Sequence, residues 1–172
     1  MGEFVRTKVV PEMDAYCLSK LAKVATDAKQ TPTATTLVNK SYAIFTEATN
    51  AALSNMGYDE EFVAFVNPAF YADLMSTTEV TRAITVQNFK KGEIDFKVKA
   101  INGVPVFPVS DSRMKDTYTF YDGVTSSGTD QRPGGFVPGA SAKDVGLLVV
   151  PKRAASLVKK TEKIRVFSPD VN

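Results

Sequence analysis

Residues 91–114 hold the most constraining pattern in this chain of 172 residues, an alternation of apolar and charged side chains. The apolar set is Ile94, Phe96, Val98 and Ala100, and the charged set is Asp95, Lys97 and Lys99. A period of two residues predicts a β-strand with one face buried. We therefore expect a strand here that turns its apolar side to a core.

A hairpin turn is predicted directly after this strand. Asn102 and Gly103 both tolerate positive φ, and this pair is the strongest short-range signal for a tight β-hairpin. A second apolar run follows at residues 104–109. Because Pro105 and Pro108 have no amide hydrogen to donate, we expect this returning run to be an edge or outgoing strand and not a fully paired central one.

The first 30 residues predict an amphipathic helix over residues 3–28. Its apolar stripe recurs at spacings of three and four and consists of Val10, Met13, Cys17, Leu21, Val24 and Ala28. Pro11 either occupies the first turn of the helix or kinks a longer one. Two interpretations of the stripe stay open: ordinary core packing, or an outer face that meets neighbouring subunits.

Further elements follow along the chain. Residues 29–36 are a linker by composition, and residues 36–56 predict a second helix that Thr35 or Thr36 caps and Gly57 ends. A buried strand is expected at residues 62–66. Asn67 then caps a helix over residues 68–76, and Pro68 occupies its first turn.

The remaining third of the chain is less regular. Residues 77–88 predict a turn and then an irregular extended piece, and short strands are expected at residues 117–121 and 144–150. Residues 122–143 are rich in Gly, Ser and Pro, so we expect a long loop between these strands. Residues 151–172 are locally basic. One interpretation is a strand whose alternate residues face water. The other is a segment that contacts DNA weakly and without sequence specificity.

The composition argues against several classes of function. The chain has no His, which is the commonest acid–base residue and metal ligand. Its single Cys, Cys17, lies on an apolar stripe and is expected to be a buried, unreactive thiol. No phosphate-binding loop and no zinc-ligand spacing occur, so we expect no enzyme, no cofactor and no metal. The net charge of +2 gives no general argument for binding nucleic acid, and no apolar run is long enough to span a membrane.

An ordered set of motifs resembles one family. The strand, then NGVPV, a proline, SDSRMK and an aromatic segment with Tyr118 and Phe120 resemble one lineage of tailed-bacteriophage major capsid proteins. VVPEMDAYCLSKLAKVA is similar to that lineage's spine helix, and FVAFVNPAFYADL to a strand–helix unit of its axial domain. The resemblance spans nearly the whole chain in order, although no single motif is specific.

The resemblance implies an α+β fold of the Hong Kong 97 type. Residues 1–30 would be the spine helix of the peripheral domain, residues 31–150 the axial domain with a mixed sheet and flanking helices, and residues 151–172 a return segment toward the peripheral domain. The family's N-terminal arm, extended loop and last peripheral strands have no counterpart here, so we expect a fragment. Some members join a Lys of that loop to an Asn of a neighbour, and no such residue carries over.

The function implied is structural: a capsid subunit made in a bacterial host's cytoplasm that self-assembles into pentamers and hexamers of an icosahedral virion shell around DNA. Two other classes stay open. One is an encapsulin-type nanocompartment, which shares the fold and encloses cargo enzymes. The other is a small-ligand-binding or carbohydrate-binding module that uses residues 122–143 as its binding loop.

Two groups of residues are candidates for subunit contacts. Within the loop, Asp130 and Arg132 are candidate polar partners across an interface, and Phe136 and Val137 form an apolar pair that needs a surface to dock on. On the first helix, the candidates are Val10, Cys17, Leu21 and Val24. We expect this part of the stripe to be partly exposed in a single chain or buried by another copy.

Overall fold

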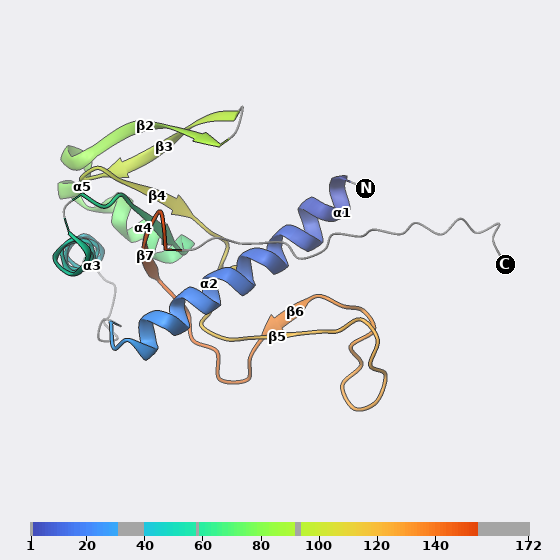
Figure 1. Ribbon diagram of the computed structural model, residues 1–172. Helices are drawn as coiled ribbons and strands as arrows, with labels where there is room; N and C mark the ends of the chain where they lie inside the picture. The colour runs from blue at the N-terminus through green and yellow to red at the C-terminus, as the bar shows by residue number, and fades with distance from the viewer. Residues whose placement is uncertain (1, 31–39, 58, 92–93, 155–172) are drawn as a thin grey trace.

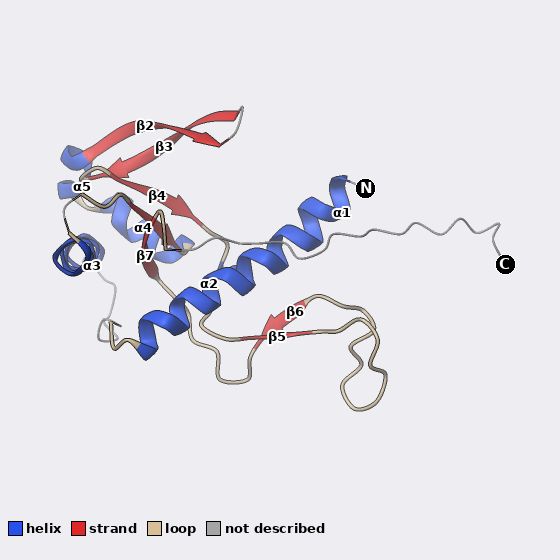
Figure 2. Cartoon of the chain, in the orientation of Figure 1, coloured by secondary structure: helices blue, strands red, loops and turns tan. Residues whose placement is uncertain are grey.

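The computed structural model describes residues 2–30, 40–57, 59–91 and 94–154. An N-terminal helix runs diagonally across a mixed β-sheet with flanking helices, and a small two-stranded hairpin lies on the other side of that helix (Figures 1 and 2). The expected α+β class is therefore confirmed. The predicted linker at residues 29–36 and the return segment at residues 151–172 lie mostly outside the described residues.

The N-terminal helix is continuous and passes through Pro11. It consists of α1 (Gly2–Phe4), the π-helical turn η1 (Val5–Val9) and α2 (Val10–Asp27). The amide of Val10 donates to the carbonyl of Val5, five residues back. A wider turn of this kind relieves the crowding that a proline ring imposes on the preceding turn, so Pro11 neither begins the helix nor breaks it.

The buried face of helix α2 consists mostly of small residues. Its buried residues are Ala15, Leu18, Ser19 and Ala22. Leu18 belongs to a cluster with Val63, Met114, Leu148 and Val150 on one side of the sheet, and Leu21 packs against this cluster. Val10 and Val24 are 40% and 65% exposed, so the predicted stripe is partly open to solvent in the single chain, as expected.

The main sheet has five strands in the order β2-β3-β4-β1-β7. Their bounds are Phe62–Val66 for β1, Ile84–Lys91 for β2, Ile94–Ile101 for β3, Val104–Pro108 for β4 and Leu147–Pro151 for β7. Strands β1 and β4 are parallel, and every other pair is antiparallel. The turn and irregular extended piece predicted at residues 77–88 are partly wrong. Helix α5 (Thr78–Ala83) replaces the turn, whereas the extended second half is confirmed and forms the first part of the regular strand β2.

The hairpin turn between β3 and β4 is confirmed, because Asn102 and Gly103 have φ of 51° and 82°. The edge position predicted for β4 is wrong, because β4 lies between β3 and β1. The strand is nevertheless not fully paired on either side, since Val104 and Pro105 pair with β3 and the next three residues pair with β1. Its prolines are tolerated at the ends of short ladders: Pro105 pairs beside the hairpin turn, and Pro108 is the last residue of the strand. The next amide, that of Val109, donates to the carbonyl of Val66 at 2.8 Å.

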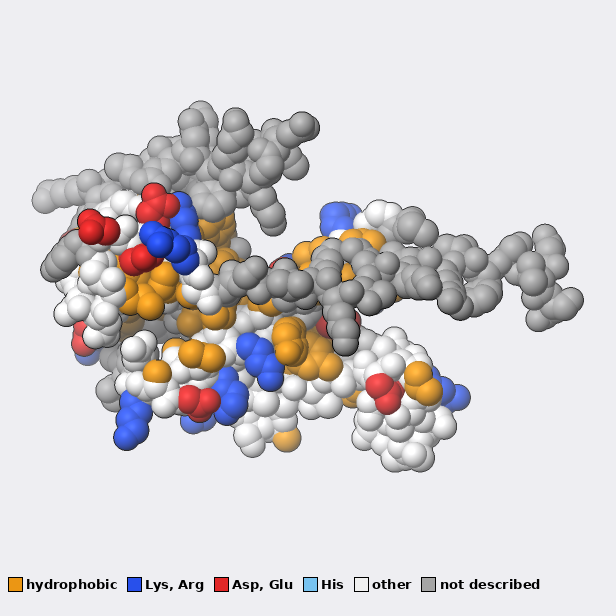
Figure 3. All heavy atoms as spheres, in the orientation of Figure 1, with side chains coloured by type: hydrophobic (Ala, Val, Ile, Leu, Met, Phe, Trp, Pro, Cys, Tyr) orange, Lys and Arg blue, Asp and Glu red, His pale blue; other side chains and the backbone are white. Residues whose placement is uncertain are grey.

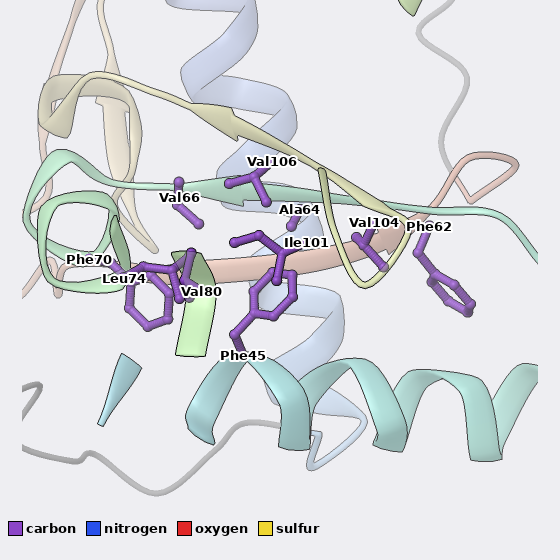
Figure 4. Close-up of a cluster of buried hydrophobic side chains, with 10 residues drawn as sticks. All are labelled: Phe45, Phe62, Ala64, Val66, Phe70, Leu74, Val80, Ile101, Val104 and Val106. Carbon is purple, nitrogen blue, oxygen red and sulfur yellow. The ribbon is translucent and has the colours of Figure 1, made fainter. Parts of the chain in front are cut away.

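Two helices cover one face of the sheet. Helix α3 (Ser41–Met56) begins five residues later than predicted and ends at Gly57, whose φ is 96°; the proposed caps Thr35 and Thr36 lie outside the described residues. Helix α4 (Pro68–Ser76) has its predicted bounds, and the Asn67 side chain accepts a hydrogen bond of 2.8 Å from the Phe70 amide. The core that these helices close is shown in Figure 4: Phe45, Phe62, Ala64, Val66, Phe70, Leu74, Val80, Ile101, Val104 and Val106.

A separate two-stranded hairpin occupies part of the predicted loop. Strand β5 (Tyr118–Phe120) is confirmed, whereas β6 (Phe136–Pro138) was not predicted. The register pairs Phe120 with Phe136 and Thr119 with Val137. The predicted loop at residues 122–143 therefore contains a strand, and its irregular part before that strand spans residues 121–135.

Candidate functional site

Two surface features come together around α2. The first is the open stripe, which we define as Val10, Met13, Cys17, Leu21 and Val24; its two ends, Val10 and Val24, are exposed, and the three residues between them are half-buried. The second is the β5–β6 hairpin, which lies beside α2 and projects away from the main sheet (Figure 1). Both are candidates for contacts between subunits, and the hairpin is described first because its packing fixes what it exposes.

Aromatic rings attach the hairpin to α2. The rings of Tyr16 on α2 and Phe120 on β5 meet edge to face, with their centroids 5.6 Å apart. Phe136 on β6 lies 6.1 Å from Phe120 and 5.4 Å from Tyr118 by the same measure. Edge-to-face pairs contribute about 0.5–1.5 kcal/mol beyond the area they bury. The sequence-predicted contact residue Phe136 is therefore half-buried within its own chain.

Polar contacts fix the base of the hairpin. The Tyr118 hydroxyl donates to the carbonyl of Ser112 at 2.9 Å and accepts from the Lys115 amide at 3.0 Å. Ser112 belongs to the short helix η2 (Asp111–Arg113), and the Arg113 guanidinium donates to the Asp14 carboxylate on α2 at 3.0 Å. Burial raises the pKa of Tyr118, which keeps the hydroxyl protonated and able to donate. The hairpin is thus tied to α2 at its base as well as by its rings.

The loop between the two strands is organised by Asp122. Its carboxylate accepts hydrogen bonds of 2.9 Å from the amides of Val124 and Thr125, and one from the Thr125 hydroxyl. Hydrogen bonds to the carboxylate favour its charged form, so they lower the pKa of Asp122. The bond from the Thr125 hydroxyl has the largest effect, and the bonds from the two amides follow. The loop thus folds around its own polar groups.

Acid should loosen this loop. Because the folded pKa of Asp122 lies below its unfolded value of about 3.9, the carboxylate stabilises the loop above that value and loses this effect as the pH falls through the folded pKa. We expect NMR titration to give Asp122 a pKa below that of an unfolded Asp. The variant Thr125→Val should raise the pKa toward the unfolded value, while Thr129→Val, elsewhere in the loop, should leave it unchanged. An unshifted Asp122 in the natural chain would contradict the hydrogen bonding described.

Asp130 and Arg132 pair with each other within one chain. The guanidinium Nε and Nη2 donate to the two carboxylate oxygens at 2.9 and 2.8 Å, and the Arg132 amide donates at 3.1 Å. This bonding lowers the pKa of Asp130. The predicted contacts of these residues across an interface stay a prediction, and such contacts would have to use the lone pairs and donors that the internal pair leaves free.

Val137 is the outward-facing member of the predicted apolar pair. It is 38% exposed and is register-paired with the exposed Thr119 on β5. The rings of Tyr118, Phe120 and Phe136 belong to the neighbouring register pairs, which alternate to the other face of the hairpin. The hairpin therefore packs one face toward α2 and leaves the face with Val137 open.

Cys17 lies in the middle of the open stripe and is half-buried. Burial, and then the nearby Asp14 carboxylate, raise the pKa of its thiol. A protonated thiol is a poor nucleophile, and this environment is unlike the electropositive sites of reactive cysteines. Cys17 is half-buried and therefore less buried than the sequence suggested.

The acidic turn at residues 59–61 forms ion pairs with the start of the basic C-terminal segment. Glu61 accepts from the Lys152 ammonium at 2.6 Å, and the Arg153 guanidinium lies 3.5 Å from the Glu60 carboxylate. The hydrogen bond from Lys152 lowers the pKa of Glu61. These two basic residues therefore face carboxylates of their own chain, and residues 155–172 of the segment lie outside the described part of the structure.

Four further observations bear on the class of function. No group of three or more potential metal ligands occurs within the described ranges, and no helix among those residues is long and apolar enough to cross a membrane. An open hollow along α3 is lined by Tyr42, Ala43, Thr46, Glu47, Asn50 and Ala51. No family model, no curated protein and no solved structure matches this chain. The function is therefore inferred from the fold and from the surfaces described above.

Proposed function

We propose that this chain is a structural subunit that assembles with copies of itself into a closed shell, in the manner of Hong Kong 97-type major capsid proteins of tailed phages. The supporting observation is the placement of α2. This long helix packs on the sheet through Leu18 and Leu21, while Val10 and Val24 stay exposed. A subunit of a shell needs such outward contact surfaces on elements that its own core holds rigidly.

The energetic reason is the cost of exposed apolar area. Fully burying a Val, Leu or Met side chain against a partner contributes about 1.5–3 kcal/mol relative to leaving it in water. The open stripe offers the exposed Val10 and Val24 on one rigid helix, and Val137 offers another exposed side chain on the hairpin. Self-association is the use of these residues that requires no further component.

The division of the chain also supports this proposal. A long N-terminal helix precedes a mixed sheet with flanking helices, which is the order that the sequence resemblance implies for a spine helix and an axial domain. In this proposal the protein is not an enzyme, its partners are other copies of itself in pentamers and hexamers, and it resides in the virion shell. Packaged DNA would contact the shell weakly and without sequence specificity.

The two alternative functions, a nanocompartment shell protein and a ligand-binding module, would require different surfaces. An encapsulin-type compartment would use the same surfaces and differ only in its contents. A ligand-binding module would need free polar groups in the loop, but Asp122 is bonded to Val124 and Thr125, and Asp130 to Arg132. The bonding inside the loop therefore favours an assembly function over ligand binding there.

Negative-stain imaging of the purified product of the complete gene tests the proposal. We expect rings of five and six subunits or closed shells. Nuclease-resistant DNA inside the shells would indicate a virus capsid, and a co-purifying enzyme would indicate a compartment. Single subunits that stay dispersed at high protein concentration, together with a specific thermal shift from a small ligand, would overturn the assembly function.

A further inference from the structure

The turn between β3 and β4 consists of Asn102 and Gly103, and the backbone of one can react with the side chain of the other. The amide nitrogen of the residue after an Asn can attack the side-chain carbon Cγ, and glycine hinders this attack least because it has no Cβ. Both residues are exposed. Beyond its chain neighbours, no atom lies within 4 Å of the position that a Cβ of Gly103 would occupy. The two reacting groups are therefore on the surface and unhindered.

We propose that Asn102 is a deamidation site that reacts only when the β3–β4 hairpin opens, and that the main product prevents the hairpin from closing again. In this reaction the Gly103 nitrogen forms a bond to Cγ of Asn102. The bond from Cγ to Nδ2 breaks, and ammonia leaves with the proton of the Gly103 amide. Water then hydrolyses the cyclic succinimide to aspartate or to isoaspartate, so water is the only other reactant. The inference does not depend on the proposed shell function, because it concerns the fold of one subunit.

The closed turn prevents the reaction. Asn102 has a φ of 51°, in the left-handed region where ψ is about +47°. At this ψ the Gly103 nitrogen lies on the side of the Cα–C bond opposite Cβ, whereas attack requires it beside Cβ and next to Cγ. The backbone must rotate by about half a turn around that bond before the two atoms can meet. The paired strands on either side do not permit this rotation, so Asn102 reacts only after the hairpin opens.

The hairpin can open locally because its ladder is short. Strands β3 and β4 have two register pairs, Ile101 with Val104 and Ala100 with Pro105. Pro105 has no amide hydrogen to contribute, and β4 pairs with β1 from the next residue onward. Opening exposes Ile101 and Val104, which are 0% and 7% exposed in the closed state, so it is infrequent. We therefore expect a local opening that leaves the rest of the sheet folded.

Tyr42 of α3 holds the side chain of Asn102 in the closed state. Nδ2 of Asn102 donates to the Tyr42 hydroxyl at 3.4 Å. Helix α3 is itself fixed by Phe45, which belongs to the main core. This hydrogen bond therefore favours the closed hairpin. Because Nδ2 is the atom that leaves as ammonia, the product has no such donor.

The other asparagines in the described part of the chain lack this combination. Asn50 and Asn55 lie within helix α3 and Asn88 within strand β2, and each is followed by a residue with a Cβ. Asn67 precedes Pro68, which has no amide hydrogen, and its side chain caps α4. Among the described residues, Asn102 is thus the asparagine that is followed by glycine.

The two products affect the hairpin differently. Isoaspartate adds one methylene group to the main chain, so the two-residue turn no longer matches the register of its strands. Aspartate keeps the main chain unchanged, and Asp-Gly suits the same turn as Asn-Gly. Its charge has little effect, because Glu60 and Glu61 at the same end of the sheet are already paired with Arg153 and Lys152. Figure 3 shows acidic and basic side chains side by side where β7 ends in Figure 1.

Incubation of the natural chain in mildly alkaline buffer, folded and in guanidinium chloride, is the first test. Trypsin releases residues 100–113, which contain no other asparagine, and mass spectrometry follows the conversion of the amide to a carboxyl group. We expect the folded chain to deamidate at least about 10-fold more slowly, because the reactive conformation requires opening. Equal rates, or no deamidation at Asn102 in the unfolded chain, would overturn the proposal.

The same rates distinguish local opening from global unfolding. Guanidinium denaturation followed by circular dichroism gives the fraction of chains that are unfolded in buffer. We expect the ratio of the folded to the unfolded deamidation rate to exceed this fraction severalfold. A ratio equal to the unfolded fraction would show that the turn opens only when the whole chain unfolds, and would overturn the local opening.

Removing the hydroxyl of Tyr42 tests the contact that closes the hairpin. We expect Tyr42→Phe to deamidate about 2–5-fold faster in the folded state, since an exposed hydrogen bond contributes modestly to stability. Its rate in guanidinium chloride should equal that of the natural chain. Tyr121→Phe is the matched control, because Tyr121 is also half-buried but follows β5, away from this turn. Equal folded-state rates for both variants would overturn the role assigned to Tyr42.

Comparison with Asn102→Asp tests the effect of the product. Singly deamidated chains, mostly isoaspartate, are separated from unreacted chains by ion exchange and returned to buffer. Asn102→Asp has the same charge and an unchanged main chain, so it should unfold at nearly the guanidinium concentration of the natural chain. The deamidated chains should unfold at a clearly lower concentration. A shared midpoint for the deamidated chains and Asn102→Asp would overturn the claim that the main product keeps the hairpin open.

Discussion

Replacing Phe45 by alanine is expected to lower the free energy of unfolding by about 3–5 kcal/mol. Phe45 is fully buried, and its ring reaches from α3 toward Ile101 on the sheet (Figure 4). The substitution removes an aromatic ring and leaves a cavity that helix and sheet fill only in part. Urea denaturation followed by circular dichroism measures the change.

The exposed Glu47 on the same helix provides the control. Glu47→Ala removes a side chain from the solvent-facing side of α3, so the free energy of unfolding should change by no more than about 0.5 kcal/mol. A loss below about 1 kcal/mol for Phe45→Ala would show that α3 does not pack on the sheet as described. The comparison of the two variants tests the packing of α3, which covers much of the sheet face that carries the main core.

Local turn chemistry explains which parts of the fold were predictable. Asn102 and Gly103 adopt the positive φ that their hairpin turn requires, and Gly57 ends α3 with positive φ. Asn67 caps α4 through a single hydrogen bond to an amide three residues later. In each case the residue type and its immediate neighbours determine the conformation, so the sequence is sufficient.

The incorrect predictions concern features that depend on contacts between residues far apart in the sequence. The position of β4 inside the sheet follows from its parallel pairing with β1, about 40 residues earlier in the sequence. Strand β6 has only three residues, and it pairs with β5 across a glycine-rich loop. Nothing in the local pattern of either segment specifies the partner. The tolerance of Pro105 and Pro108 depends on where each ladder ends, which the sequence does not show.

The candidate site was predictable to a similar degree. The apolar stripe of the first helix follows from spacing alone, and its partial exposure was expected. The buried face of α2 also includes small residues such as Ala15 and Ala22, whose weak hydrophobicity gives little signal. The ion pair between Arg113 and Asp14 joins residues 99 positions apart and had no local signal. The pairing of Asp130 with Arg132 had one, because Asp side chains in turns commonly bond the amide two residues later.

Val137→Asp is expected to prevent assembly while leaving the subunit folded. Val137 lies on the open face of the β5–β6 hairpin, opposite Thr119, so a carboxylate there is solvated in the single chain. The free energy of unfolding should therefore change by no more than about 0.5 kcal/mol. If this face is buried between subunits, an unpaired charge costs about 2–5 kcal/mol per contact, or at least a 30-fold loss of affinity.

Ser141→Asp provides the matched control, because Ser141 is exposed after β6 and outside the hairpin's open face. Imaging and sedimentation of the complete gene product should show particles for this control and dispersed, folded subunits for Val137→Asp. A second variant removes residues 126–135 and with them the Asp130–Arg132 pair, and it should fail to assemble if the loop tip makes contacts as well. Normal shells from both hairpin variants would limit the assembly surface to other parts of the chain, because neither the open face nor the loop tip would then be required.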